Sequence, residues 1–598
     1  MVFKNIRMIN ANSDFPDEKR YYDDSAYGVT CYSNLRPNRD GGAIYADSSL
    51  SIVNSTFSNN TALNGGAIYS FSQVRISNSS FTDNGAGDDG GAIYSFNDVF
   101  ITNTNFTDNW AVDVGGAVSC LSTIEATDSV FKNNYNFEIS AGQFISNNNK
   151  IINEGYGDLF ANASVHNGIV TLNGNYDAKG TVLINASNVV IDGRGYTIDA
   201  KNRSRIFNIT GDNVTIKNIR LINGKSTNNG GAIHVSSSSL TIMNSTFENC
   251  IAQIGGAVYG NLTNITVIGS TFTCNKVNDF SGSEIAIGGA ICTDNGTASV
   301  SDSYFINNFA FDGGAISAEY AFISIQDSYF ENNSASVYGG GAVSSGIGVN
   351  VSDSTFVGNY ANRYGGAIFC FNQAKINIRN SIFENNTSHN YGGAVSAAVW
   401  AEIIDSLFTG NYASSHAGAI SLWGNLTVKN SNFTCNSAET GGVIFDYSPV
   451  STVSITNSNF INNTQKTYGV LYITNNAFVS DSSFINNHAY DGVGGAIVSC
   501  QNITVSNSIF KNNSAVRSWG YSLGGAIINY GQNLNVMHSI FTDNSAHSGG
   551  AIINFAGNAT VDCSSFANNS AEEGGACFKY TDSRLLVSNS IFENNSQL

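Results

Sequence analysis

The sequence predicts an all-β protein, a right-handed parallel β-helix solenoid with about 25 residues per coil. Three observations predict it: a block of residues that recurs along the chain, β-branched residues at one place in that block, and the absence of helical periodicity. The chain has 598 residues, with 61 Gly and only 3 Pro. Because a single core stops growing at roughly 250–300 residues, a chain of this length forms several domains or one elongated array. The scarcity of proline leaves no visible domain linkers, which favours the array.

The recurring block begins with Asn54-Ser55-Thr56-Phe57 and reaches Gly65-Gly66-Ala67-Ile68 after a short turn. Its copies mostly lie about 24–27 residues apart, a spacing typical of solenoids. That length is too short for the usual strand-helix-strand crossover, so each unit predicts one coil of two or three short strands. Parallel pairing of coils stacks like residues, and the crossover rule predicts the right hand. The predicted column of buried phenylalanines includes Phe57, Phe81, Phe106, Phe305, Phe330, Phe356, Phe383, Phe408 and Phe433.

Two corners follow from the phase of the apolar residues. Ile52 and Phe57 lie five positions apart, so they would point to opposite faces of an unbroken strand. If both are buried, the strand bends between them, at Asn54-Ser55, and asparagine tolerates the left-handed backbone that such a corner requires. The Gly65-Gly66 pair predicts a second corner or a close approach of two backbone segments.

Three segments follow from the distribution of the block. Residues 1–134 and 230–598 carry the repeats, whereas residues 135–229 lack the phenylalanine signature and keep strand-like alternation, as in 189–199. We interpret 135–229 as divergent coils and as a candidate domain boundary. The sequence leaves open whether these coils continue the first solenoid or begin another.

Charge and hydropathy exclude two classes of function. The formal net charge of -18 repels polyanions, so we expect no nucleic-acid partner. No run of about 18 apolar residues occurs, so we expect no transmembrane helix. The first residues do not resemble a signal peptide, and both ends of the chain have the character of strands. We therefore expect a section of a longer polypeptide whose signal and anchor lie in flanking regions.

Candidate catalytic and metal-binding residues are few. Asp83, Asp88 and Asp89 lie in a glycine-rich stretch that has two interpretations, a calcium site built from oxygen ligands or a solvated polar turn. Other aspartates, such as Asp302 and Asp327, recur at the corner position, so they are structural rather than catalytic. The seven histidines form no metal-type pair. We predict no catalytic residue and, apart from calcium, no cofactor.

Cysteine spacing suggests one crosslink. The ten cysteines fit neither a Cys-x-x-Cys zinc site nor a dense disulfide scaffold. Cys250 and Cys274 lie about one period apart, and adjacent coils fall within disulfide reach. They differ by one position in register, so a disulfide and two buried thiols both stay open.

Aromatic residues just after the phenylalanine of the block form a candidate binding stripe. Such a stripe would stack on sugar rings or contact a protein ligand, whereas the alternative is local packing in turns. The residues are Trp110, Phe309, Tyr360 and Tyr412.

The paired signatures Gly365-Gly366-Ala367-Ile368 and Phe383-Glu384-Asn385-Asn386 resemble the repeats of the chlamydial polymorphic outer membrane proteins and of archaeal adhesin-like proteins. Asp192-Gly193-Arg194-Gly195 resembles coils of the broader pectin-lyase-like β-helices. The repeat resemblance implies a secreted or cell-surface location, with the outer membrane or cell envelope included, and an adhesive role.

Two functions are therefore weighed. The first is an adhesin-like repeat protein that attaches to extracellular glycans or to surface proteins of other cells. The second is a polysaccharide lyase or glycoside hydrolase of the pectin-lyase-like fold, which requires a single cleft with a unique carboxylate or Arg/Lys cluster.

Overall fold

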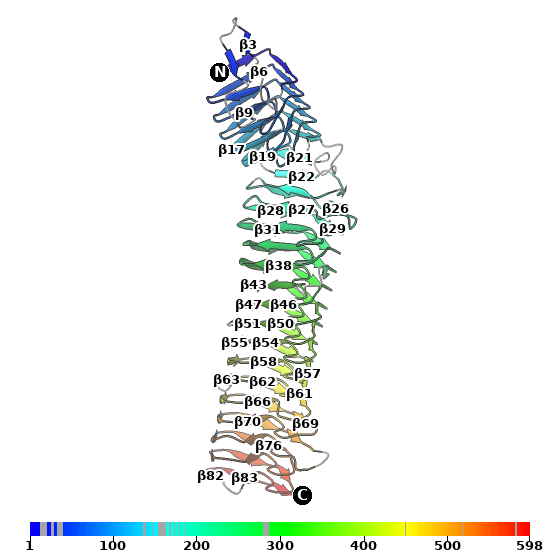
Figure 1. Cartoon of the computed structure of the whole chain (residues 1–598). Helices are drawn as coiled ribbons and strands as arrows, with labels where there is room; N and C mark the ends of the chain where they lie inside the picture. Colours follow the sequence, from blue (N-terminus) through cyan, green and yellow to red (C-terminus); the bar gives the residue numbers. More distant parts are fainter. Residues whose placement is uncertain are drawn as a thin grey trace. The chain divides into compact units, whose positions relative to one another are not determined.

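Figure 1 shows the computed structural model of the chain, which forms two compact units. The first comprises Met1–Ser226, Gly230–Cys250 and Gly260–Thr266, and the second comprises Thr227–Asn229, Ile251–Tyr259 and Val267–Leu598. The structure describes residues 1–11, 21–24, 29–32, 40–134, 139–147, 149–152, 163–166, 169–172, 174–178, 180–185, 187–278, 286–372, 374–448, 450–517, 520–580 and 583–598.

The predicted all-β parallel solenoid is confirmed in both units. Within the described residues, regular secondary structure consists of strands alone. A coil of the second unit contains four strands rather than the two or three expected, because two residues after the phenylalanine block add a short strand. One such coil is formed by β51 (Lys375–Arg379), β52 (Ile382–Glu384), β53 (Thr387–Ser388) and β54 (Val395–Ala397).

Long parallel sheets run through the second unit, as the successive labels from β46 (Val343–Ser345) to β70 (Ile497–Ser499) show in Figure 1. The first sheet runs from β39 (Thr297–Ser301) to β82 (Arg584–Ser588), and the phenylalanine sheet from β36 (Thr271–Thr273) to β83 (Ile591–Glu593). The third, which we call the lateral sheet, runs from β38 (Ile291–Asp294) to β81 (Cys577–Lys579). A fourth set of short strands includes β41 (Phe309–Ala310), β49 (Tyr360–Ala361) and β57 (Tyr412–His416).

The first unit contains two sets of sheets. Strands β6 (Leu50–Val53), β10 (Val74–Ser77) and β14 (Val99–Thr102) pair in parallel, and this set extends through β20 (Lys150–Ile152). New sheets begin with the antiparallel pair β21 (Ala163–His166) and β22 (Ile169–Leu172), and parallel coils follow. The region 135–229 thus first extends the old sheets and then starts new ones, while its predicted domain boundaries stay a prediction.

The corners have the predicted backbone conformation. Asn54 and Asn380, before the phenylalanine of their blocks, have φ of 48° and 46°. A second left-handed position, which the sequence analysis missed, lies two residues after the phenylalanine, where Asn59 and Asn385 have φ of 54° and 53°. Asparagine tolerates these angles because its short side chain bonds locally, so each coil turns twice around its phenylalanine.

The Gly-Gly pair fulfils both roles that the sequence suggested. Gly365 has a φ of +57° and therefore turns the chain. Gly366 lies so close to the next coil that a Cβ atom would come within 2.0 Å of the Gly393 carbonyl oxygen. The first position needs glycine for its left-handed backbone angle, whereas the second needs glycine because a side chain there would clash with the next coil.

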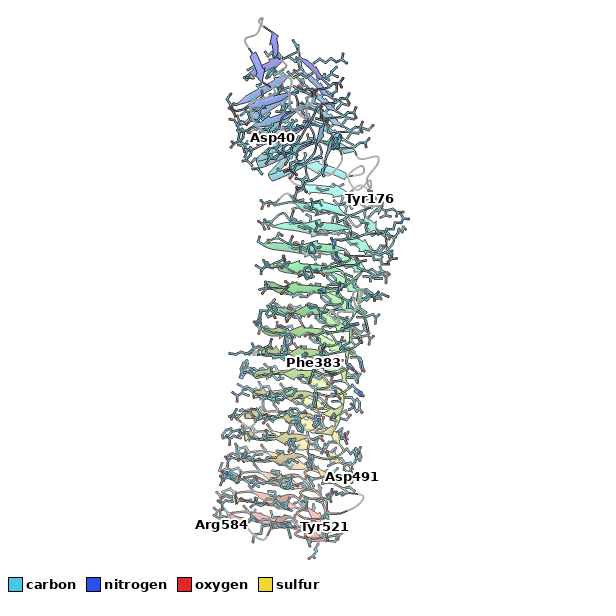
Figure 2. The ribbon with its side chains drawn as sticks, viewed as in Figure 1. Asp40, Tyr176, Phe383, Asp491, Tyr521 and Arg584 are labelled. Carbon is cyan, nitrogen blue, oxygen red and sulfur yellow. The ribbon has the colours of Figure 1, made fainter. Side chains whose placement is uncertain are left out.

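Phenylalanine rings fill the interior as one continuous stack in each repeat region. Figure 2 draws Phe383 within the coils, where it is fully buried. Its ring centroid lies 4.8 Å from that of Phe356 and 4.7 Å from that of Phe408. All nine phenylalanines of the predicted column are fully buried, and the neighbours among them stack at 4.7–5.0 Å.

Asparagine amides form a second buried column beside the rings. The Asn386 Nδ2 donates to Asn411 Oδ1 at 3.0 Å and to the Phe356 carbonyl at 2.9 Å. The Asn386 Oδ1 accepts from the backbone and side-chain nitrogens of Asn359 at 3.0 and 2.9 Å. Each buried amide is therefore satisfied by the coils before and after it, which offsets the cost of burying it.

Replacing Phe383 with alanine should lower the free energy of unfolding by about 3–5 kcal/mol, because it leaves a cavity between two stacked rings. The measurement is the chemical or thermal unfolding curve of the second unit within the full chain. Tyr412→Ala is the control, since Tyr412 is 46% exposed. Equal unfolding curves for the wild type and Phe383→Ala would contradict the buried placement.

Asn386→Ala should lower the unfolding free energy by about 3 kcal/mol or more, because it leaves the buried Asn359 backbone amide without its partner and removes the side-chain bonds to the Phe356 carbonyl and to Asn411 Oδ1. Asn350→Ala removes one exposed amide bond, to Asn377, and should cost less than about 0.5 kcal/mol. Two variants of equal stability would show that the amide column contributes little.

Candidate functional site

The outer face of the lateral sheet carries two neighbouring columns of side chains. One contains the middle residue of each strand, because successive side chains of a strand point to opposite faces. In β50 (Ile368–Cys370) that residue is Phe369, and its register partners along the sheet are Ser396, Ser421 and Phe445. The other column contains the residue before each Gly-Gly pair. The backbone bridges of Tyr391 to Tyr364 and His416 hold this column in line.

Over several consecutive coils of the second unit, aromatic side chains occupy many positions of these two columns and the position just after some of the strands. They come from β50, β58 (Ile420–Leu422), β62 (Ile444–Asp446), β66 (Leu471–Ile473) and the turns beside them. We call this set the aromatic patch. It comprises Tyr364, Phe369, Phe371, Tyr391, His416, Trp423, Phe445, Tyr447, Tyr468 and Tyr472.

The rings of the aromatic patch meet in two orientations. Tyr364 and Tyr391 stack at 5.4 Å with a 12° angle between ring planes, and Trp423 stacks on Tyr447 at 4.7 Å and 14°. The Tyr391 ring stands at 65° to Trp423 and at 78° to Tyr447. The patch therefore presents ring faces and ring edges in one continuous surface, an arrangement that aromatic quadrupoles favour.

The aromatic patch is open to solvent at some rings and closed at others. Trp423 is 40% exposed and Tyr468 is 43% exposed, whereas Phe445 is buried. Tyr364, Tyr391 and the remaining rings have intermediate exposure. The buried Phe445 packs against Tyr447 and Tyr472, so buried rings support the more exposed ones.

The aromatic patch is uncharged at neutral pH. Burial lowers the pKa of His416 below its ordinary value, and the nearby Glu439 opposes this only in part. Burial, followed by the neighbouring Tyr391 and Tyr364, raises the pKa of Tyr447 far above its ordinary value. The buried Asp446 carboxylate accepts hydrogen bonds from the Ser448 amide and from the Ser451 and Thr474 hydroxyls. Its charge is therefore satisfied from within the protein.

The stripe predicted from the sequence lies on a different face. Phe309, Tyr360 and Tyr412 belong to the short fourth strands, and Tyr360 and Tyr412 are exposed. Ser334 and Thr387 separate them in register, so their rings lie two coils apart. Trp110, in the first unit, packs over Gly85, where a Cβ atom would lie 2.1 Å from the indole. The predicted residues thus form no continuous aromatic surface.

The structure brings two of the three calcium candidates together. Asp88 and Asp89 join Asp113, from the next coil, with carboxylate oxygens within 4.8 Å of one another. Burial, followed by the charges of Asp88 and Asp113, raises the pKa of Asp89. Asp83 is not part of this cluster and occupies a left-handed corner, with a φ of 55°. Calcium binding stays a prediction.

Cys250 and Cys274, for which the sequence left open a disulfide or two buried thiols, are both free. Cys274 is a free, exposed thiol at a left-handed corner with a φ of 55°. Cys250 occupies the buried asparagine position of its coil, where its Sγ lies 3.5 Å from the Glu248 carbonyl oxygen. The difference of one position in register therefore turns one thiol outward and the other inward.

An open pocket in the first unit was a candidate for the enzyme alternative. It is lined by Asp192, Arg194, Asn218 and Arg220, among others. Burial raises the pKa of Asp192, but hydrogen bonds from Arg194 and Asn218, together with Lys217, outweigh burial and lower it. Arg220 pairs with Glu248 at 2.9 Å. Asp192 is therefore held ionised, which does not suit a general acid.

Asp312 is a better acid candidate, and the sequence analysis missed it. Burial raises the pKa of Asp312 to about 6, and Glu319 adds to the rise. The Ser344 hydroxyl and the Gly339 amide donate to its two oxygens at 2.9 and 3.2 Å. A carboxyl with a raised pKa beside another carboxylate has the character of a general acid. Only its spatial neighbours reveal it, because its sequence context is an ordinary Asp-Gly-Gly.

Comparison with known proteins supports the repeat assignment. The model of the Chlamydia polymorphic membrane protein (Chlamydia_PMP) repeat matches residues 54–70, 78–95, 353–370 and 380–398. The chain carries polymorphic membrane protein repeats. Each match starts at a corner of the phenylalanine block and extends through the following Gly-Gly pair, so the family signature and the structural coil coincide. The matched segments cover well under half of the chain.

Other comparisons add little. A surface adhesin of Streptococcus pneumoniae, PfbA, aligns with 76% of this chain and 84% of its own at 12% identity and a TM-score of 0.16. At that TM-score the likeness carries no argument. No curated protein matches the chain. Among the described residues, no helix has the length and apolar character needed to cross a membrane.

Asp312→Asn should remove a pH dependence of stability between about pH 4 and 6. The pKa of Asp312 is raised in the folded protein, so its stabilising contribution is complete below the unfolded pKa and is lost as the pH rises through 6. The stability of the wild type relative to Asp312→Asn should therefore increase by about 1–2 kcal/mol from pH 7 to pH 4. Unfolding curves at several pH values measure this.

Asn350→Ala, which removes no titratable group, is the control for the Asp312 variant. A stability difference between wild type and Asp312→Asn that does not change with pH would contradict a raised pKa.

Proposed function

We propose that this protein is an adhesin-like protein of the cell surface that attaches to glycans or proteins of other cells through the outer face of its lateral sheet. The single observation that carries the proposal is the aromatic patch, a continuous and partly exposed band of rings on a repeat scaffold. Exposed aromatic surface of this extent is costly in a protein without a partner, and it is typical of interaction sites. The polymorphic membrane protein repeats support a surface location.

The scaffold suits attachment better than turnover. Its interior columns repeat from coil to coil, and its outer positions vary, so binding groups are displayed along one rigid face. Modest affinity at each site is sufficient when many copies are displayed on one surface, because the later binding events become intramolecular.

A second candidate function, polysaccharide cleavage, is favoured by one observation. Asp312 combines a pKa raised by burial with the nearby carboxylate of Glu319, which adds to the rise. Hydrolases use such an acid together with a second carboxylate. Both Asp312 oxygens already accept hydrogen bonds from the protein, which favours a structural role.

The two functions are separated by incubating the purified protein with pectin, polygalacturonate, mucin glycans and whole host cells. We expect retention of the protein on mucin glycans or on cells, without release of sugar products. Heat-unfolded protein is the control for nonspecific retention. Product release that disappears in Asp312→Asn would replace the adhesin proposal with the enzyme.

A further inference from the structure

We infer that the aromatic patch is a binding site for the pyranose rings of an uncharged glycan. This inference rests on the proposed attachment function and specifies its ligand. Three independent features of the patch point to such a ligand: the arrangement of its rings, the unpartnered hydroxyls beneath them and the absence of charge.

The ring arrangement fits a sugar with one apolar face. The C–H groups on one side of a pyranose carry partial positive charge, and they are attracted to the negative face of an aromatic ring. Trp423 and Tyr447 form one stack and Tyr364 and Tyr391 another, nearly perpendicular to it. The exposed Trp423 offers a ring surface for stacking, while the Tyr391 stack bounds the site on its second side. Rings that recur from coil to coil can meet successive sugar units of a chain.

Two buried hydroxyls lie under the rings without partners. Ser396 and Ser421 occupy the outward column between Phe369 and Phe445, and both are fully buried. No described protein group accepts from or donates to either hydroxyl oxygen. Buried polar groups of native proteins nearly always have hydrogen-bond partners, so two unsatisfied hydroxyls at one place call for an explanation. A glycan hydroxyl, reached by a small movement of the covering rings, supplies the missing bonds.

The electrostatics select an uncharged sugar. His416 is the one titratable imidazole of the patch, and burial favours its neutral form. Glu439, whose charge acts on the pKa of His416, pairs with Lys466 at 3.5 Å. The Asp446 carboxylate is satisfied by Ser448, Ser451 and Thr474. The patch itself therefore contains no lysine or arginine for a uronate or a sulfate, and the two nearby cations are engaged elsewhere, Lys466 with Glu439 and Arg363 over the Tyr338 ring.

The test is binding of the full chain to immobilised oligosaccharides, with cellohexaose, maltoheptaose and lacto-N-tetraose as uncharged probes. Polygalacturonate and heparin are the charged probes. We expect retention on at least one uncharged probe and none on the charged ones. Trp423→Ala should weaken that binding by about tenfold or more, since one stacking ring is lost. Tyr412→Ala is the matched control, because it removes an exposed ring outside the patch, and its affinity should stay within about twofold of the wild type.

Ser421→Ala tests the hydroxyls separately and should weaken binding by about threefold to tenfold, because one hydrogen bond to the sugar is lost. If Trp423→Ala unfolds at a lower temperature than the wild type, Trp423→Phe replaces it, since it keeps the packing. Tryptophan fluorescence gives a second measurement: the uncharged probe should shift the emission of the wild type, which has 4 Trp, and not that of Trp423→Phe.

The outcomes separate the two proposals. Equal binding by the wild type and Trp423→Ala, or retention on the charged probes alone, would overturn the patch inference. Wild-type protein that adheres to cells but binds no uncharged probe would also overturn it, while leaving the attachment function standing. A wild-type protein that binds neither cells nor any glycan would contradict both the patch inference and the attachment function.

Discussion

The structure depends on one constraint, which is that each coil must return to the same position one strand spacing further along. The asparagine column enforces this constraint. An amide that donates to one coil and accepts from the other has good geometry only when its neighbours repeat its position, and the side-chain bonds between asparagines of this column in the second unit all lie within 2.8–3.1 Å. Phenylalanine stacking contributes more apolar burial, but it tolerates small shifts between rings. The amides therefore set the register and the rings add stability.

The constraint acts on the interior and leaves the outside free to vary. In the outward column of the lateral sheet, large Phe369 and Phe445 flank small Ser396 and Ser421, whereas the buried residue before each of them stays aliphatic, as Ile368, Val395, Ile420 and Ile444 show. Such freedom allows one stretch of coils to gather an aromatic surface without disturbing the stack. It also explains why the features with chemical character, the aromatic patch and Asp312, lie on the same face: the turn before each Gly-Gly pair adds a second outward residue to every coil.

Departures from the repeat show which positions tolerate replacement. Ala417 occupies a first-glycine position with a φ of 62°, and Cys274 and Cys435 occupy asparagine corners with φ of 55° and 56°. A left-handed corner needs a backbone angle, so another residue can adopt it at a cost of roughly 1–2 kcal/mol. The second glycine has no such freedom, because a Cβ atom at Gly393 would come within 2.1 Å of the Gly418 carbonyl oxygen. This second position is still glycine at Gly418, where the first glycine is replaced by Ala417.

The sequence alone determined the parallel solenoid, the buried phenylalanines and the left-handed corner before them. The residues that impose these backbone angles and this burial recur from one repeat to the next, so the pattern is visible without a structure. It did not reveal the fourth strand, the second left-handed corner or the bonding of the asparagine column. Only the tertiary structure decided the outer surface. Tyr364, Tyr391, Trp423 and Tyr447 occupy different positions of different coils, and the same holds for Asp113 beside Asp88. Contacts of this kind depend on which coil lies next and on the direction of each side chain, and the sequence of a single repeat specifies neither.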